Sequence, residues 1–178
     1  MMTDLSVQLA VLGAGPGGDA AAFLAADLGM TVALIDEDVN PGGVCLYRGC
    51  IPSKALLHVA KLLEETKHAA AWGIEFGAPR IDLDRLRAFK SGIVAKLTGG
   101  LGQLSKQRKV EYVRGRASVA DARTFVVATA EGERRVRFEH GILATGSVPS
   151  RIPNLPDDPR VLDSTARSSC PTCRRACS

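Results

Sequence analysis

The order of apolar and polar positions predicts a strand, a glycine turn, a helix and a second strand within the first 36 residues. Residues 7–12 are apolar except for Gln8, and they run directly into a glycine-rich turn. An alanine-rich stretch at 20–28 ends at Gly29, and residues 31–35 form a second apolar run. Short apolar runs on either side of a helical stretch are typical of two buried, parallel strands.

Helical spacing of apolar residues recurs over residues 53–70 and again after Asp82, which can cap the second of these helices. Four glycines weaken that second helix, so the pattern leaves its length open. Strands are then expected at residues 110–113, 117–120, 124–129, 134–138 and 141–144. The middle three form an antiparallel meander, and the last returns to the sheet. The sequence therefore predicts an α/β fold with a parallel sheet, helices on both faces and a β-meander.

The glycine turn carries the first candidate chemistry. Residues 13–18 read GAGPGG, a GxGxxG pattern formed by Gly13, Gly15 and Gly18 with Pro16 and Gly17 between them. The first glycine allows the tight turn, the second lets a pyrophosphate approach the backbone, and the third lets the helix pack on the strand. Pro16 costs little because the first helical N–H groups lack intrahelical partners.

An acidic residue ends the second strand. Asp36 lies 18 residues after Gly18, where it can accept hydrogen bonds from ribose hydroxyls. Glu37 is the alternative for this role, and Asp36 could also be an ordinary solvated carboxylate. Strand, glycine turn, helix, second strand and terminal acid together predict a dinucleotide site.

Residues 42–54, GGVCLYRGCIPSK, set Cys45 and Cys50 five positions apart at the start of a helix. An unbroken helix would hold their Cα atoms about 8–9 Å apart, whereas bridged cysteines need roughly 7 Å or less. The segment must therefore bend. Gly49 permits the bend, and Pro52 is expected to keep the preceding Ile51 out of the helical region.

The second cysteine lies where a thiolate is stabilised. The N–H groups and dipole of a helix N-terminus favour the charged form of Cys50, and the cation of Lys54 adds to that effect. We interpret the pair as a working disulfide. Two buried thiols that pack as small hydrophobic groups are the alternative.

These motifs together resemble the pyridine nucleotide-disulfide oxidoreductases, flavoenzymes that pass electrons between a nicotinamide, FAD and a redox-active disulfide. The resemblance rests on residues 13–18, on 42–58, and on ILATGS at 142–147 with Pro149, and it covers most of residues 7–165. It implies a Rossmann-like FAD-binding domain. It also implies that Gly43 and the turn formed by Ala144, Thr145 and Gly146 border the flavin cofactor.

The resemblance assigns roles to the thiol segment. Cys45 corresponds to the thiol that exchanges with the substrate, Cys50 to the thiol against the flavin, and Lys54 to the lysine beside the reactive flavin nitrogen. Ser53 favours the dihydrolipoyl dehydrogenase branch, which oxidises dihydrolipoamide with NAD. Glutathione reductase-like and mercuric reductase-like enzymes remain alternatives, and Tyr47-Arg48 departs from the commoner Asn-Val between the cysteines.

The same resemblance implies partners and further domains. It suggests a homodimer that serves the lipoyl domain of a 2-oxoacid dehydrogenase or glycine cleavage complex. The family architecture adds a nicotinamide domain and an interface domain with a catalytic His-Glu pair, and neither is recognisable in this sequence. Relative to that architecture the FAD domain is incomplete. We therefore expect no steady turnover by this chain alone, and a non-catalytic FAD-binding fragment is the alternative function.

The composition changes at residue 167. Residues 1–166 read as the N-terminal part of the FAD domain, whereas 167–178 read as an aberrant tail, which we interpret as the product of a frameshift near Arg167. Cys170, Cys173 and Cys177 are one ligand short of a closed zinc site, and the three histidines lack metal-ligand spacing, so we expect no metal.

Charge and hydropathy exclude some classes of partner. The net charge is +4, but residues 167–178 hold three arginines and no acids, which leaves 20 basic and 19 acidic residues before them. No nucleic-acid surface is implied. No segment is long and apolar enough to span a membrane, and the N-terminus lacks a secretory pattern, so a cytoplasmic location is expected.

Overall fold

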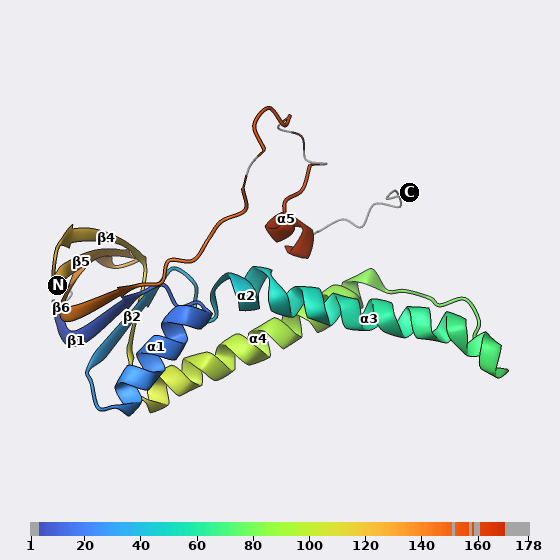
Figure 1. Ribbon diagram of the computed structural model, residues 1–178, viewed down its shortest axis with the longest axis horizontal. Helices are drawn as coiled ribbons and strands as arrows, with labels where there is room; N and C mark the ends of the chain where they lie inside the picture. Colours follow the sequence, from blue (N-terminus) through green and yellow to red (C-terminus); the bar gives the residue numbers. More distant parts are fainter. Residues whose placement is uncertain (1–3, 151, 157, 159–160, 170–178) are drawn as a thin grey trace. The chain divides into compact units, whose positions relative to one another are not determined.

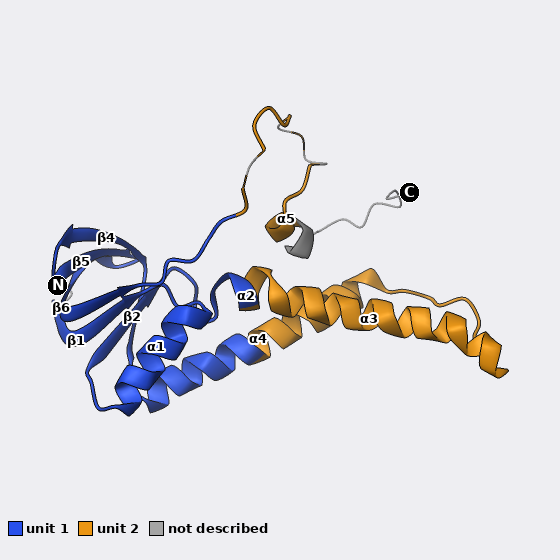
Figure 2. Ribbon diagram, viewed as in Figure 1, with its two compact units in different colours: residues 1–45, 97–148 blue, residues 46–96, 149–178 orange. Residues whose placement is uncertain are grey.

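The computed structural model describes residues 4–150, 152–156, 158 and 161–169 (Figure 1). Residues 170–178, which make up most of the expected frameshifted tail and hold its three cysteines, lie outside this range. The chain divides into two units (Figure 2). Unit 1 contains residues 1–45 and 97–148, and unit 2 contains residues 46–96 and 149–178.

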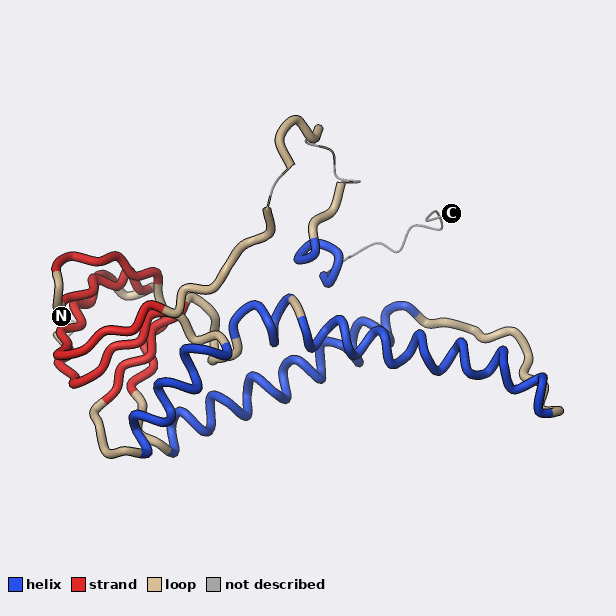
Figure 3. Tube along the Cα trace, in the orientation of Figure 1, coloured by secondary structure: helices blue, strands red, loops and turns tan. Residues whose placement is uncertain are grey.

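Unit 1 is built on a six-stranded sheet (Figure 3). Its strands are β1 (Leu5–Leu12), β2 (Val32–Asp36), β3 (Glu111–Arg114), β4 (Arg116–Asp121), β5 (Thr124–Thr129) and β6 (Gly132–Leu143). Their order in the sheet is β3-β2-β1-β6-β5-β4. β3, β2, β1 and β6 pair in parallel, whereas β4, β5 and β6 pair antiparallel. The predicted α/β fold with a parallel sheet and a meander is confirmed.

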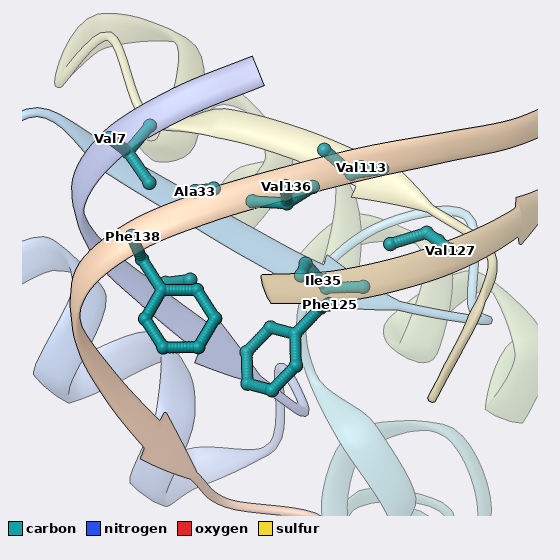
Figure 4. Packing of buried hydrophobic residues seen from close by; sticks show 9 residues of the cluster. Val7, Ala33, Ile35, Val113, Phe125, Val127, Val136 and Phe138 are labelled. Carbon is teal, nitrogen blue, oxygen red and sulfur yellow. The ribbon is translucent and has the colours of Figure 1, made fainter. Parts of the chain in front are cut away.

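Alternation along the buried strands creates two cores. In β2, Val32 and Leu34 point to one face, where they pack with Ala22 and Ala25 of helix α1 (Pro16–Asp27). Ala33 and Ile35 point to the other face. There they join side chains from the meander, including Phe125 and Phe138, whose ring centroids lie 4.5 Å apart (Figure 4). Helix α1 therefore covers one face of the parallel strands, and the meander curls over the other.

The sheet curls because the chain passes directly from one of its edge strands to the other. β3 and β4 are the two edge strands of the sheet, yet Gly115 alone separates them in sequence. The Gly115 amide donates to the Asp36 carbonyl over 2.8 Å. A Cβ at this position would overlap the Ala128 carbonyl. The backbone can therefore pass from one edge to the other only where no side chain intervenes.

One strand is longer than expected. The sequence predicts separate strands at residues 134–138 and 141–144, but a single strand, β6, runs from Gly132 to Leu143, and of the two ranges only Ala144 lies beyond it. Its first half pairs with β5 and its second half continues along β1. Gly141 does not interrupt the strand because its backbone stays in register with Ala10 of β1.

Unit 2 contains helical segments. Helix α3 (Cys50–His68) continues into the 3₁₀ turn η1 (Ala69–Trp72), and Gly73 ends it in the left-handed region with φ +82°. Helix α4 (Leu83–Gln107) begins in unit 2, and its residues 97–107 belong to unit 1. It runs through all four glycines without a break. A short helix, α5 (Ser164–Ser169), lies near the end of the described chain. None of the helices in the described residues has the length and apolar character needed to cross a membrane.

The predicted cap of α4 is present. Asp82 Oδ1 accepts hydrogen bonds from the backbone amides of Asp84 and Arg85, at 3.1 and 3.0 Å. Such a cap satisfies helix-terminal donors that have no intrahelical partner.

We predict that Asp82→Ala destabilises α4, because two terminal amides lose their acceptor. The loss should be about 1 kcal/mol in the free energy of unfolding, measured by urea denaturation followed by circular dichroism. Asp84→Ala is the matched control. It removes an exposed first-turn acid that pairs with Arg87 but caps no amide, so it should cost much less. Equal losses in the two variants would contradict the capping role.

Candidate cofactor-binding and thiol site

The turn between β1 and α1 needs its first and third glycines for packing. Gly13 has φ +99°, and its amide donates to the Ile35 carbonyl over 2.8 Å. A Cβ on Gly13 would overlap the carbonyl of Ala144, and a Cβ on Gly18 would overlap the carbonyl of Gly13. Because these two residues have no side chains, the backbones of β1, α1 and the end of β6 can come into direct contact.

The second glycine has a different environment. A Cβ on Gly15 would meet nothing closer than the Cα of Gly43 at 3.9 Å, and a Cβ on Gly17 would meet nothing within 4 Å. Pro16 is the first residue of α1, in the first turn as expected, and Gly15 is the N-cap. This end of the helix carries no side-chain cap, so its positive partial charge is available to an anion. The protein leaves room here for a ligand that approaches the backbone.

Asp36 connects the end of β2 to the glycine turn. Its Oδ2 accepts from the Ala14 amide at 2.7 Å, and its Oδ1 accepts from the Asp38 amide at 3.0 Å. Each carboxylate oxygen has a further lone pair, so the half-buried group can still accept from a hydroxyl. Glu37 is exposed, and its Oε1 lies 3.6 Å from Arg116. An exposed pair of this kind contributes little to stability.

The segment that leads to the first cysteine lies against the same turn. The Gly42 amide donates to the Ala14 carbonyl over 2.7 Å. Gly43 has φ +55°, and a Cβ there would overlap the backbone of Gly15. Both glycines of the 42–43 pair are therefore packed on the glycine turn, and Gly42 was not among the expected site residues.

The ATG turn completes this group. The Ala144 amide donates to the Leu12 carbonyl over 2.8 Å, which extends the pairing of β1 and β6 past Leu143. Ala144 is partly buried, Thr145 and Gly146 are exposed, and Gly146 has φ +72°. β1 has β2 on one side and β6 on the other, so these residues gather where the strand order reverses. Ligands bind at this position in open α/β sheets.

The thiol segment forms two helices separated by one residue. Helix α2 (Gly43–Arg48) carries the half-buried Cys45, and Gly49, with φ −131° and ψ −107°, separates it from α3. The predicted bend at Gly49 is confirmed. Cys50 is the first residue of α3 and is exposed, and Lys54 follows one turn later, also exposed. Cys45 belongs to unit 1, whereas Cys50 and Lys54 belong to unit 2.

One local expectation is wrong. Ile51 was expected outside the helix because it precedes Pro52, but it lies within α3. Pro52 is the third residue of the helix, where its missing N–H costs nothing. Proline only disfavours the helical conformation of the residue before it, and the first turn of α3 overrides that preference.

An acid in the first turn of α1 was also missed. Asp19 is 9% exposed, and its amide donates to the Gly15 carbonyl over 2.9 Å. Burial raises the pKa of its carboxyl above the ordinary value, and a hydrogen bond from the Ala20 amide offsets part of that rise. Its place between glycine and alanine gave no indication of burial.

A cavity of about 590 Å³ in unit 1 shares only Glu37 with the candidate site residues. Glu37 lines it together with the β3–β4 junction and the turn between β5 and β6, but the glycine turn does not. It is therefore not the space beside the N-terminus of α1. Within the described residues, no cluster of three or more His, Cys, Asp or Glu side chains could hold a metal ion.

Comparison with known proteins agrees with this geometry. The family described as pyridine nucleotide-disulphide oxidoreductase matches residues 7–175. The chain belongs to this family. Members of the pyridine nucleotide-disulphide oxidoreductase family are flavoproteins with a Rossmann-like domain, which accounts for the glycine turn at the reversal of strand order.

Curated relatives from several bacteria carry the name dihydrolipoyl dehydrogenase. That of Haemophilus influenzae is 50% identical over 167 residues, which are 93% of this chain and 35% of the relative. That of Vibrio cholerae is 46% identical over 166 residues, again 93% and 35% of the two chains. That of Geobacillus stearothermophilus is 42% identical over 161 residues, or 90% and 34%. The chain thus spans about a third of the length of these relatives.

We predict that Asp19→Asn stabilises the fold at neutral pH. Because the folded-state pKa of the Asp19 carboxyl is raised, the folded protein loses stability as the pH rises from the unfolded-state pKa of 3.8 through the folded-state pKa. The neutral amide avoids that loss. The variant's melting temperature should exceed that of the wild type at pH 7, and the difference should shrink toward pH 3.8. Glu75→Gln, at an exposed carboxyl, should change the melting temperature at neither pH. A gain for Asp19→Asn that is independent of pH would contradict this explanation.

Proposed function

We propose that the chain supplies the FAD-binding and disulfide segment of a dihydrolipoyl dehydrogenase, which oxidises protein-bound dihydrolipoamide and reduces NAD. One observation carries the proposal. The glycine turn, Asp36, the 42–43 pair and the ATG turn meet at the carboxyl ends of β1, β2 and β6, and the cysteine segment continues directly from the 42–43 pair. The names of the relatives support the substrate class.

The residues at this position fit a flavin dinucleotide. The uncapped N-terminus of α1 and the open side of Gly15 suit the pyrophosphate. Asp36 has lone pairs left for ribose hydroxyls. Thr145 and Gly146 follow the last pairing of β6 and would border the cofactor. When bound, FAD would take up the electron pair from the cysteines and pass it to NAD as a hydride.

The two cysteines would divide the thiol chemistry. A dihydrolipoamide thiolate attacks the Cys45 sulfur of the Cys45–Cys50 disulfide, and Cys50 leaves as a thiolate. The second lipoyl thiol then attacks the mixed disulfide, which releases reduced Cys45 and lipoamide disulfide. Cys50 is the first residue of α3, and Lys54 follows one turn later.

The partners follow from the same proposal. A lipoyl domain of a 2-oxoacid dehydrogenase or glycine cleavage complex would deliver the substrate, and a homodimer with a nicotinamide domain would complete the enzyme in the cytoplasm. A related disulfide reductase is the second candidate. Tyr47-Arg48 replaces the commoner Asn-Val pair between the cysteines, and this departure keeps the substrate preference open. Turnover of lipoamide, glutathione and mercuric substrates by the full-length form, in which the nicotinamide and interface domains are present, would separate these candidates.

The thiol assignment predicts a spectral signature. With FAD bound anaerobically, one equivalent of dithiol should produce a long-wavelength charge-transfer band, because the Cys50 thiolate would lie against the flavin. Cys50→Ser should abolish the band. Cys45→Ser, the matched control, should show it without dithiol, because its Cys50 can no longer be held in the disulfide. Failure to bind FAD, or a band that survives in Cys50→Ser, would contradict the proposal.

If Asp36 rather than Glu37 binds the ribose, substitutions of these two residues should differ in their effect on FAD affinity. Asp36→Ala should weaken FAD binding by about 10-fold or more, because a charged acceptor contributes roughly 1.5–3 kcal/mol and the Ala14 amide loses its partner. Glu37→Gln should change the affinity less than about twofold. Both affinities are measured by quenching of flavin fluorescence. The reverse order would assign the ribose contact to Glu37.

A further inference from the structure

The segment between the ribose acid and the first cysteine contacts a glycine of α4. A Cβ built on Gly102 would overlap Asn40 Oδ1 and lie 3.0 Å from its Cγ. Both residues belong to unit 1 and both are half-buried. The absent side chain of Gly102 therefore leaves a notch on α4, and the Asn40 amide occupies it.

The other glycines of the helix do not share this contact. A Cβ on Gly92, Gly99 or Gly100 would meet nothing within 4 Å. Glycine in a helix interior is destabilising relative to alanine, and at those three positions no packing requirement for it is visible. At Gly102, by contrast, an added Cβ would meet the Asn40 side chain, which would have to move.

The wall of the notch is anchored. Just past the end of α4, Arg108 Nε lies 2.9 Å from Asp27 Oδ1 at the end of α1, and the Arg108 guanidinium lies over the Phe23 ring at 5.3 Å. Figure 2 shows residues 97–107 of α4 running beside α1 within unit 1. The notch is therefore fixed to the helix whose N-terminus forms the candidate cofactor site.

The residues after Asn40 transmit its position to the glycine turn. Pro41 is fully buried and has a fixed φ, so it allows the segment little freedom. The next residue, Gly42, donates to the Ala14 carbonyl, and Gly43 packs on Gly15. A shift of the Asn40 backbone would thus reach the two residues that lie on the glycine turn.

We propose that Gly102 and Asn40 are positioning residues: the Gly102 notch seats the Asn40 side chain and thereby holds residues 41–43 against the cofactor turn. The inference about cofactor affinity rests on the proposed function, whereas the seating of the segment does not. Neither residue lies in a motif that the sequence analysis singled out.

The first test needs no flavin. In the full 178-residue chain, Gly102→Ala should accelerate deuterium exchange at the Gly42 amide several-fold, because the displaced segment weakens its bond to Ala14. Gly99→Ala is the matched control on the same helix. It should leave that exchange rate unchanged and raise the melting temperature, since alanine favours the helix. Equal exchange at Gly42 in the two variants would overturn the proposal.

A double-mutant cycle identifies the contact. Asn40→Ala removes the seated amide without touching α4, so it should also accelerate exchange at Gly42, and it serves if Gly102→Ala fails to fold. In that background Gly102→Ala should have no further effect, because the overlapping group is gone. Additive effects would overturn the assigned contact.

Flavin binding is the second readout. Gly102→Ala should weaken FAD binding by about 3-fold to 10-fold, while Gly99→Ala should not change it. If the wild-type chain binds no FAD, the proposed function fails. The exchange rate at the Gly42 amide would still show whether Gly102 seats the Asn40 side chain. If the wild type binds FAD and Gly102→Ala binds it equally well, the role in positioning the cofactor turn is overturned.

Discussion

The candidate site depends on how closely the backbone after β1 approaches the backbone after β6. Gly13 and Ala144 come so near that no side chain fits between them, and Gly18 is equally close to Gly13. Because the contact is between main-chain atoms, it fixes the ends of both strands and the start of α1 as one rigid corner. Asp36 and the 42–43 pair are then held to that corner by hydrogen bonds to Ala14.

Much of this corner could be predicted from sequence because its rules are local. Glycine at a positive φ, an acid at the end of a strand and a capping aspartate each leave a signal within a few residues. The GxGxxG pattern, the break at Gly49 and the Asp82 cap were all found in this way. The meander was also visible, because alternating apolar residues bounded by turns need no knowledge of the partner strand.

The parts that could not be predicted depend on contacts between distant residues. β6 is continuous because β1 supports its second half, and nothing within residues 134–144 indicates that partner. Asn40 and Gly102 are 62 positions apart, so only the folded chain shows their contact. Ile51 differs, because there two local rules conflict, and the first turn of the helix prevails over the proline that follows.

The single-residue connection at Gly115 also limits how the sheet can vary in length. β3 and β4 lie on opposite edges of the sheet. Any residue inserted or deleted between them would therefore disturb the parallel pairing of β3 with β2 and the antiparallel pairing of β4 with β5 together. A one-residue shift in the register of β3 or β4 would turn the buried Val113 or the half-buried Ala117 to the opposite face of the sheet. Homologous chains should therefore keep this junction at constant length and accommodate insertions in the turn between β4 and β5, where only one edge is affected.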